Sequence, residues 1–480
     1  RLPRGTTRFT FRARPMPDLK VLCMPLLLLC LLSVVASAHD PPATGPYLPS
    51  PTPDRIILTH SGNPATTQAV TWRTDSVAGT PQVEFASATA TGPFGGRQGF
   101  AIAAAAAQAT TQWLDTELGR AAYHTAEMVG LEPQTLYAYR VGDGTVWSEW
   151  FHFRTASRGA EPFTFVYVGD AQNDLKSLWS RTVRQAYVQA RPQLLVHAGD
   201  LVNRAHHDAE WGEWFYAAGW INGMVPSLPV AGNHEYCDGL SRNWRPTFAL
   251  PLNGPAGLEE TVYYLDYQGV RFVALNSNEK WEAQAGWLEQ VLAGNPNRWT
   301  VAVFHHPVFS AAAGRDNLHL RQRWMPVFDR HGVDLVLQGH DHTYGRTGTV
   351  RSAVNVSDGQ SGTVYVVSVS GPKMYDSAEH PLMVRLGENL QLYQVIAVDG
   401  DKLSYESRTV TGELYDAFAL HKQDDGTNLL ISTLPDDAPE SRREPTILSM
   451  LKPAALAAKI PASLRALSPE PCRPELGLTE

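Results

Sequence analysis

The chain has 480 residues, of which 43% are apolar and 18% charged, and its formal net charge is −8. This length is enough for two or three domains with a large buried core, and the composition excludes a chain disordered along its whole length. The acidic balance argues against a protein that binds nucleic acid through bulk positive charge, so we expect no nucleic-acid partner. If the substrate is an anion, bound metal ions would supply the missing local positive charge.

Residues 1–38 have the pattern of a secretory signal peptide with upstream residues. Lys20 precedes an apolar run at 21–35, and small residues lead to Ala38, after which we expect cleavage. The run of about 15 residues is short for a membrane span, and an uncleaved anchor is the alternative. We therefore expect a secreted or periplasmic protein with no membrane span after cleavage.

Residues 39–53 are rich in proline and form a predicted linker, and residues 54–156 predict an all-β sandwich. Short runs that mostly alternate with a period of two and are separated by Gly, Pro or Asn indicate strands at 55–59, 68–72, 82–85, 135–141 and 150–155. The run at 131–140 resembles the fibronectin type III-like strand that carries a tyrosine corner. The alanine run at 103–107 breaks the pattern and predicts a loop or a loose helix.

Residues 160–425 predict an α/β domain. A continuous apolar run at 163–168 leads to Asp170, as in a strand buried on both faces, and the next such run ends at Asp200, one β-α-β unit further on. Apolar residues at helical spacing follow the first of these strands, from 175 to 190. Later strands are predicted to end at Asn233, His305 and His340, with helices at 209–218, 282–293 and 318–331 and strand-like runs at 262–276, 363–369 and 391–407.

Residues 426–480 turn to Pro, Ser and mixed charge with weak periodicity. This composition predicts a mostly disordered tail, with a short helix at 446–458.

Five successive strand ends carry side chains that can bind metal. They are Asp170 and Gln172, Asp200, Asn233 with His234, His305, and His340 with His342. Polar groups at the carboxyl ends of strands in an α/β sheet meet at one rim, and the glycine that precedes four of these motifs allows a sharp turn. Each motif alone is compatible with a turn or with a hydrogen-bonded core residue, but all five in this order favour a metal site. The donors are oxygen and nitrogen only, which suits Fe, Mn or Zn.

These motifs resemble those of the metallophosphoesterase superfamily, in its purple acid phosphatase-like branch, over residues 54–420. The resemblance implies a four-layer αββα sandwich preceded by an immunoglobulin- or fibronectin-like β-sandwich. It also implies two divalent or trivalent metal ions and a small phosphate ester as substrate. Site one would use Asp170, Asp200 and His342, and site two would use Asp200, Asn233, His305 and His340. Asp200 would bridge the ions, and His234 would contact the phosphoryl group or protonate the leaving group.

The chain departs from the purple enzymes at three places. Asn203 replaces the tyrosine that ligates ferric iron and gives the colour, so a ferric–tyrosinate centre is not expected. Gln172 stands where that branch has glycine and other members have a histidine ligand, and we expect its amide oxygen to ligate site one or, alternatively, to cap a turn. The substrate-facing histidines about ten residues after His305 are missing, and Arg315 is the candidate phosphate contact, with a surface charge as the alternative.

We therefore predict an exported dinuclear metal-dependent phosphatase that hydrolyses phosphomonoesters by attack of a metal-bound hydroxide. Such hydrolysis needs up to about 10²¹-fold acceleration, and a general acid supplies only about 10²–10⁴, so metal ions must contribute most of the remainder. The alternatives are a phosphodiesterase or nucleotide pyrophosphatase on the same metal core, and a surface-binding module with a vestigial metal site. The sequence makes no prediction about the oligomeric state.

Overall fold

A computed structural model describes residues 45, 47–90, 104–356, 362–435 and 437–442. The predicted signal segment at 1–38 and the predicted helix at 446–458 lie outside these residues. Among the helices of the described part, none combines the length and the hydropathy that a membrane crossing requires.

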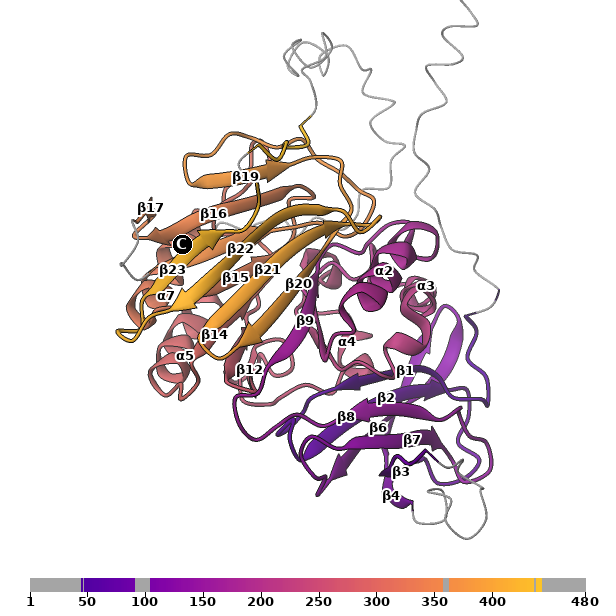
Figure 1. The fold of residues 1–480 in the computed structure, drawn as a ribbon. Helices are drawn as coiled ribbons and strands as arrows, with labels where there is room; N and C mark the ends of the chain where they lie inside the picture. The colour runs from indigo at the N-terminus through magenta and orange to yellow at the C-terminus, as the bar shows by residue number, and fades with distance from the viewer. Residues whose placement is uncertain (1–44, 46, 91–103, 357–361, 436, 443–480) are drawn as a thin grey trace, which may run out of the picture. The chain divides into compact units, whose positions relative to one another are not determined.

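The N-terminal part is a β-sandwich (Figure 1). One layer contains β1 (Asp54–Thr59), β2 (Thr67–Thr74), β6 (Gly119–Val129) and β5 (Thr110–Thr116), and the other contains β4 (Ala105–Gln108), β3 (Gln82–Ser87), β7 (Leu136–Gly142) and β8 (Phe151–Arg154). Apolar side chains from both layers, such as Trp72 and Tyr139, form its core. The tyrosine corner is confirmed, because the hydroxyl of Tyr137 accepts a hydrogen bond from the backbone N–H of Glu132 at 2.9 Å.

The five strands predicted for this part are confirmed, but the expectation for the alanine run is wrong. Ala105 to Gln108 form the edge strand β4, in which Ala105 pairs with Phe85 of β3. Alanine brings little side chain to pack, so pairing with β3 decides its conformation where local preference does not. The hairpin of β5 and β6 was not predicted, because Thr110, Thr111 and Gln112 at its start are exposed and give no apolar alternation.

The strands that follow complete two sheets (Figure 1). The first sheet has eleven strands, in the order β23-β22-β21-β20-β9-β10-β11-β1-β2-β6-β5, and the second has eight, in the order β12-β13-β14-β15-β18-β16-β17, with β19 also pairing with β16. New strands of the first are β9 (Phe163–Val168), β10 (Leu194–His197), β11 (Ser227–Pro229), β20 (Leu392–Asp399), β21 (Lys402–Thr409), β22 (Leu414–Lys422) and β23 (Asn428–Ser432). The second contains β12 (Tyr263–Tyr267), β13 (Val270–Ala274), β14 (Trp299–Val303), β15 (Leu335–Gln338), β16 (Tyr344–Arg351), β17 (Val354–Asn355), β18 (Thr363–Val367) and β19 (Met383–Gly387).

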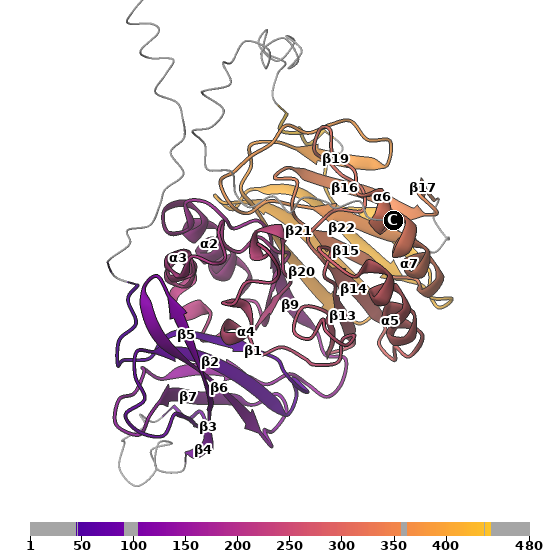
Figure 2. The ribbon, with the colours of Figure 1, turned by 180° about the vertical axis from the view of Figure 1, so that it is seen from behind.

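Helices cover the outer faces of the two sheets (Figure 2). The π-helical turn η3 (Leu175–Trp179), α2 (Ser180–Ala190) and α3 (Asp208–Ala218) pack on the first sheet, and α5 (Trp281–Ala293), α6 (Leu318–Arg323) and α7 (Met325–His331) pack on the second. Short elements are η4 (Gly219–Ile221), η5 (Asn233–Glu235) and α4 (Trp244–Thr247). Alternation along β13 places Phe272 in the core between the sheets and Val273 in the core under the helices, so the predicted four-layer αββα arrangement is confirmed.

Two predicted boundaries are corrected. The single helix expected at 318–331 is interrupted at Trp324, and Pro326, in the first turn of α7, lacks the N–H that a continuous helix would need there. The tail predicted from 426 begins too early, because β23 pairs with β22 and the carbonyl of Ser441 accepts the N–H of Glu388 at 2.7 Å. Pairing with β22 orders residues 428–432, although the segment as a whole is rich in Pro, Ser and charged residues.

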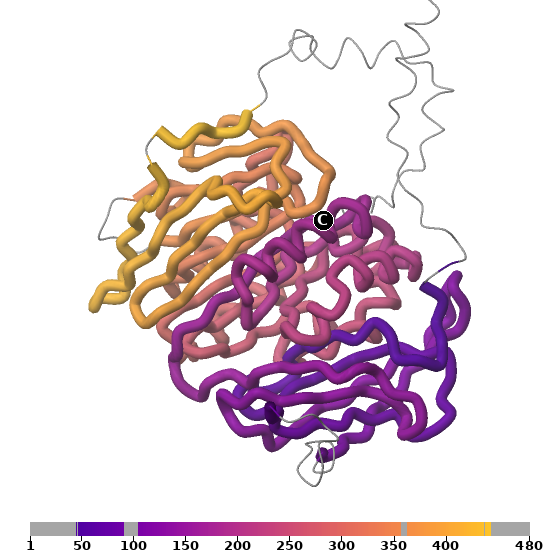
Figure 3. Tube along the Cα trace, turned by 45° about the vertical axis from the view of Figure 1, so that its right-hand side comes forward, coloured from indigo at the N-terminus to yellow at the C-terminus, as the bar shows by residue number. Residues whose placement is uncertain are grey.

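The β-sandwich and the α/β domain share the first sheet. Thr59 at the end of β1 pairs in parallel with Ser227 of β11, and the N–H of Leu58 donates to the carbonyl of Asn222 at 2.9 Å. Figure 3 shows the indigo strands of the sandwich running beside the magenta segments that follow. The strands β9, β10 and β11 therefore belong to a sheet that continues into the N-terminal strands.

A buried ionic cluster joins the same two parts. Asp208, at the start of α3, accepts hydrogen bonds from Arg55 of β1, from Arg73 of β2 at 3.0 Å and from the hydroxyl of Tyr123 at 3.1 Å. Arg73 also binds Asp54 at 2.6 and 2.9 Å. Burial alone would raise the pKa of Asp208, but the two guanidinium groups hold it below its usual value. Its stabilising contribution is therefore present above about pH 4 and is lost as the pH falls through the folded-state pKa.

We predict that Asp208→Ala destabilises the fold by about 3–5 kcal/mol, because it leaves two buried guanidinium groups without their shared carboxylate. Asp54→Ala is the matched control: the side chain of Asp54 is 38% exposed, and we expect a loss of about 1 kcal/mol or less. Urea unfolding of both variants at pH 7 measures the difference. Equal losses would show that Asp208 contributes no more to stability than the partly exposed Asp54.

Candidate metal centre

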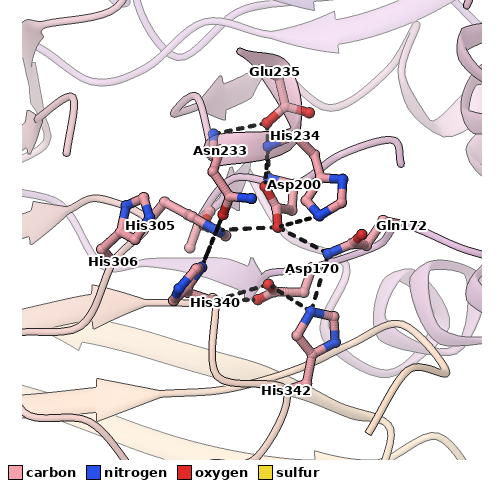
Figure 4. A network of polar contacts seen from close by, with 12 residues as sticks. Asp170, Gln172, Asp200, Asn233, His234, Glu235, His305, His306, His340 and His342 are labelled. Carbon is pink, nitrogen blue, oxygen red and sulfur yellow. Dashed lines mark hydrogen bonds and ion pairs between the residues drawn. The ribbon is translucent and has the colours of Figure 1, made fainter. Parts of the chain in front are cut away.

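Loops that follow β9, β10, β11, β14 and β15 bring the predicted site residues together (Figure 4). Four of the predicted site residues have left-handed backbone conformations: Asp170 (φ 52°), Asp200 (φ 52°), His340 (φ 73°) and His342 (φ 50°). Such conformations cost energy and persist only where the surroundings enforce them. Sharp turns directly after the strands therefore aim these side chains into one place.

Glycines in these loops allow the close approach of neighbouring chains. A Cβ atom at Gly232 would overlap the carboxylate of Asp200, and one at Gly339 would overlap the carboxylate of Asp170. Gly199 has a φ of 85°, as expected for a glycine that makes a sharp turn. The predicted sharp turn is thus seen at Gly199, whereas Gly232 and Gly339 do not have a positive φ and instead leave space for a carboxylate.

One group of donor atoms surrounds the carboxylate of Asp200 on the side of His305 and His340. Nε2 of His305 lies 3.2 Å from Oδ2 of Asp200 and 3.2 Å from Nδ1 of His340. The amide oxygen of Asn233 lies 3.1 Å from that Nε2 and 2.9 Å from that Nδ1. Because Nδ1 of His305 donates to the carbonyl of Ala198 at 2.8 Å, its Nε2 is left to face the other donors.

A second group lies on the other side of the same carboxylate. Its members are Asp170, Gln172, Asp200 and His342, all of them buried. Nδ1 of His342 donates to the carbonyl of Lys373 at 2.8 Å, so that Nε2 faces the group at 3.5 Å from Oδ1 of Asp170. One ligand atom from each of Asp170, Asp200 and His342 can be chosen so that the three lie within 4.8 Å of one another, and the same holds for Asp200, His305 and His340.

Gln172 shows how the second group would fit a cation. Its Nε2 lies 2.9 Å from Oδ2 of Asp200 and 3.0 Å from Nε2 of His342, whereas its Oε1 is buried without a hydrogen-bond partner. A half-turn of the amide would exchange the two atoms and point the oxygen at the same place as the carboxylate and the imidazole. The buried, unpartnered oxygen and the set of oxygen and nitrogen donors therefore fit a cation at this position.

The electrostatics of the protein without metal support the same conclusion. Burial lowers the pKa of His305, but the charge of Asp200 outweighs it and raises this pKa to about 9. Burial raises the pKa of Asp170 to about 8, while His305 and His234 keep the pKa of Asp200 well below its usual range despite burial. A proton on His305 thus supplies part of the positive charge that the surrounding donors require.

His234 and Arg315 lie at the edge of this centre. Nδ1 of His234 is 2.5 Å from the carbonyl of Asn203, and its Nε2 is 3.9 Å from Oδ2 of Asp200. Arg315 donates to the carbonyl of His340 at 2.9 Å, and its guanidinium lies 4.8 Å from the ring centroid of Tyr375. These contacts hold Arg315 beside the centre. Its side chain is 31% exposed and so remains open to solvent.

Two buried carboxylates that organise the loops were not predicted as site residues. Glu235 accepts the backbone N–H groups of Gly232, Asp200 and Leu201 at 2.8–2.9 Å and so ties the loop after β11 to the loop after β10. Asp341 accepts the hydroxyl of Ser310 at 2.6 Å and the N–H groups of residues 311 and 312. Both follow a metal-capable residue directly, which was the only signal in the sequence.

Comparisons with known proteins agree with this architecture. Residues 53–155 match the family model described as "Purple acid Phosphatase, N-terminal domain", and residues 163–344 match the one described as "Calcineurin-like phosphoesterase". Purple acid phosphatase 23 of Arabidopsis thaliana is 26% identical over 52% of this chain and 62% of its own length, and human acid phosphatase type 7 is 28% identical over 68% and 75%. The structure of the purple acid phosphatase PPD1 from yellow lupin has the same fold, with a TM-score of 0.66 and 18% identity over 78% of this chain and 75% of that one.

The match covers only 62–63% of the length of relatives from Mycobacterium tuberculosis and Arabidopsis thaliana. The two matching domains nevertheless follow one another in the same order as the two parts of the fold, at residues 53–155 and 163–344. Residues 163–344 therefore match a calcineurin-like phosphoesterase domain, and residues 53–155 before them match the N-terminal domain of the purple acid phosphatases.

Proposed function

We propose that the protein is an exported phosphatase that hydrolyses phosphomonoesters with two metal ions. The observation that carries this proposal is the position of Asp200, whose carboxylate belongs to both donor groups. A carboxylate shared in this way is suited to bridge two cations. The match of residues 163–344 to a calcineurin-like phosphoesterase domain supports hydrolysis of a phosphoric ester.

The donor atoms divide between two metal sites. Site one would use Asp170, Gln172, Asp200 and His342, and site two would use Asp200, Asn233, His305 and His340. Carboxylate, amide and imidazole donors suit Fe, Mn or Zn. When bound, the two cations would neutralise charge on the phosphoryl group and acidify the attacking water.

Residues at the edge would bind and orient the ester. Nδ1–H of His234 is held by the carbonyl of Asn203, so the ring is fixed with Nε2 towards the centre. In its imidazolium form, His234 could deliver the Nε2 proton to the leaving oxygen and become the neutral ring. Arg315 presents its open side beside His340, and a guanidinium can bind two phosphoryl oxygens at once. The net charge of −8 gives no general attraction for an anion, so the site itself must supply it.

We predict that Asp200→Asn lowers kcat for an aryl phosphate by about 10³-fold or more, because loss of the shared carboxylate removes several kcal/mol of transition-state stabilisation. The matched control is Asp424→Asn, the same change at an exposed position, which should leave the rate unaltered. Steady-state assays with an aryl phosphate and a bis-aryl phosphate in parallel provide the measurement. An unchanged rate in Asp200→Asn would refute the proposed site, and a faster rate on the diester would replace the monoesterase by a phosphodiesterase.

We also expect Gln172→Leu to weaken the binding of one of the two metal ions by about 10–100-fold, because it removes one oxygen donor from site one. Calorimetric titration of the metal-free protein with Mn²⁺ measures the affinities of both metal sites. Gln423→Leu, at an exposed position, is the control. Two unchanged affinities would mean that the amide of Gln172 caps a turn and does not ligate.

Export is proposed from the composition of residues 1–38. Mass spectrometry of the protein recovered outside the cytoplasm should give a chain that begins at His39. A mature protein that still contains Lys20 would support an uncleaved anchor.

A further inference from the structure

One histidine beside the metal centre has no part in the proposed chemistry. His306 follows His305 directly, and the centroid of its ring lies 4.2 Å from that of His340 and 5.0 Å from that of His305. Figure 4 shows His306 on the side of the centre opposite to His234. Arg315 also contacts His340, through its carbonyl, so His306 and Arg315 both flank the same residue of site two.

Ser277 determines which nitrogen of His306 carries the proton. Its hydroxyl oxygen accepts the backbone N–H of His306 at 3.0 Å and lies 2.8 Å from Nδ1 of the same ring. In the described part of the chain the hydroxyl hydrogen of Ser277 has no other acceptor, so it donates to Nδ1. A neutral imidazole that accepts at Nδ1 carries its proton on Nε2 and is a donor there.

The second ring nitrogen of His306 is open. Nε2 has no hydrogen-bond partner among the described residues, yet this atom is not fully buried. It is therefore in contact with solvent, although most of the ring is packed against other histidines. His306 thus presents a fixed N–H donor at the edge of site two.

We propose that His306 contacts the substrate, with Nε2–H donating a hydrogen bond to a phosphoryl oxygen on the side of site two. This inference rests on the proposed function and extends it. The chain has Arg315 in the stretch ten residues after His305, and the next histidine there, His319, packs on Trp281 with 4.3 Å between ring centroids. His306 therefore supplies a neutral donor on the side of site two where Arg315 supplies a guanidinium.

The test compares two amide substitutions in the full-length, metal-loaded protein. His306→Asn keeps a polar atom near the position of Nδ1 and loses the distal donor, whereas His306→Gln places an amide N–H near the position of Nε2. Inorganic phosphate is the probe, measured by calorimetry, and the metal content of each protein is measured beside it. We expect two metal ions per chain in both variants, at least about tenfold weaker phosphate binding in His306→Asn, and recovery of most of that loss in His306→Gln.

Kinetics separate substrate contact from a structural role. His306→Asn should raise KM for an aryl phosphate about tenfold with a smaller change in kcat. Ser277→Ala, which frees the ring but keeps Nε2, should weaken phosphate binding less than His306→Asn does.

Unaltered phosphate affinity in His306→Asn would overturn the inference, and so would an equal loss of metal in both amide variants, because the ring would then serve to position His340. If the wild-type protein binds metal and phosphate but hydrolyses no phosphate ester, the proposed function fails. The comparison of phosphate affinities then still decides the assignment of His306.

Discussion

The centre depends on lone pairs that face one another. Oδ2 of Asp200, Nε2 of His305, Nδ1 of His340 and the amide oxygen of Asn233 lie within 2.9–3.2 Å of their neighbours, with too few protons to satisfy them all. Such a buried arrangement is costly unless positive charge fills it. Proton uptake by His305 offsets part of the cost, and cations would offset the whole of it. The donor geometry is therefore that of a binding site kept ready by the rest of the fold.

The rest of the fold keeps these atoms in place through the backbone. Glu235 binds three N–H groups from two loops, and the carbonyls of Ala198 and Lys373 hold the rings of His305 and His342. The left-handed residues of the loops could not persist without such restraints. These hydrogen bonds thus define where the donor atoms point.

The sequence was informative where chemistry and periodicity coincide. Continuous apolar runs that end in Asp170, Asp200 and His340 indicated the strands and the edge at which these side chains meet. Both signals lie within a few consecutive residues of the sequence. The strands β4, β5 and β23 were missed or misplaced because they are edge or near-edge strands, whose ordering comes from partners distant in sequence. Glu235 was missed because a carboxylate that binds backbone N–H groups looks the same in sequence as one that faces solvent.

The sheet shared by the two parts limits how the protein can be divided into separate domains. β11, which leads into Asn233, has β10 on one side and β1 of the sandwich on the other. Without the N-terminal strands, β11 would become a free edge, open to pairing with another chain and prone to aggregation. The N-terminal part thus covers the edge of this sheet, and an excised phosphoesterase domain would expose the hydrogen-bonding groups of β11, one loop away from Asn233.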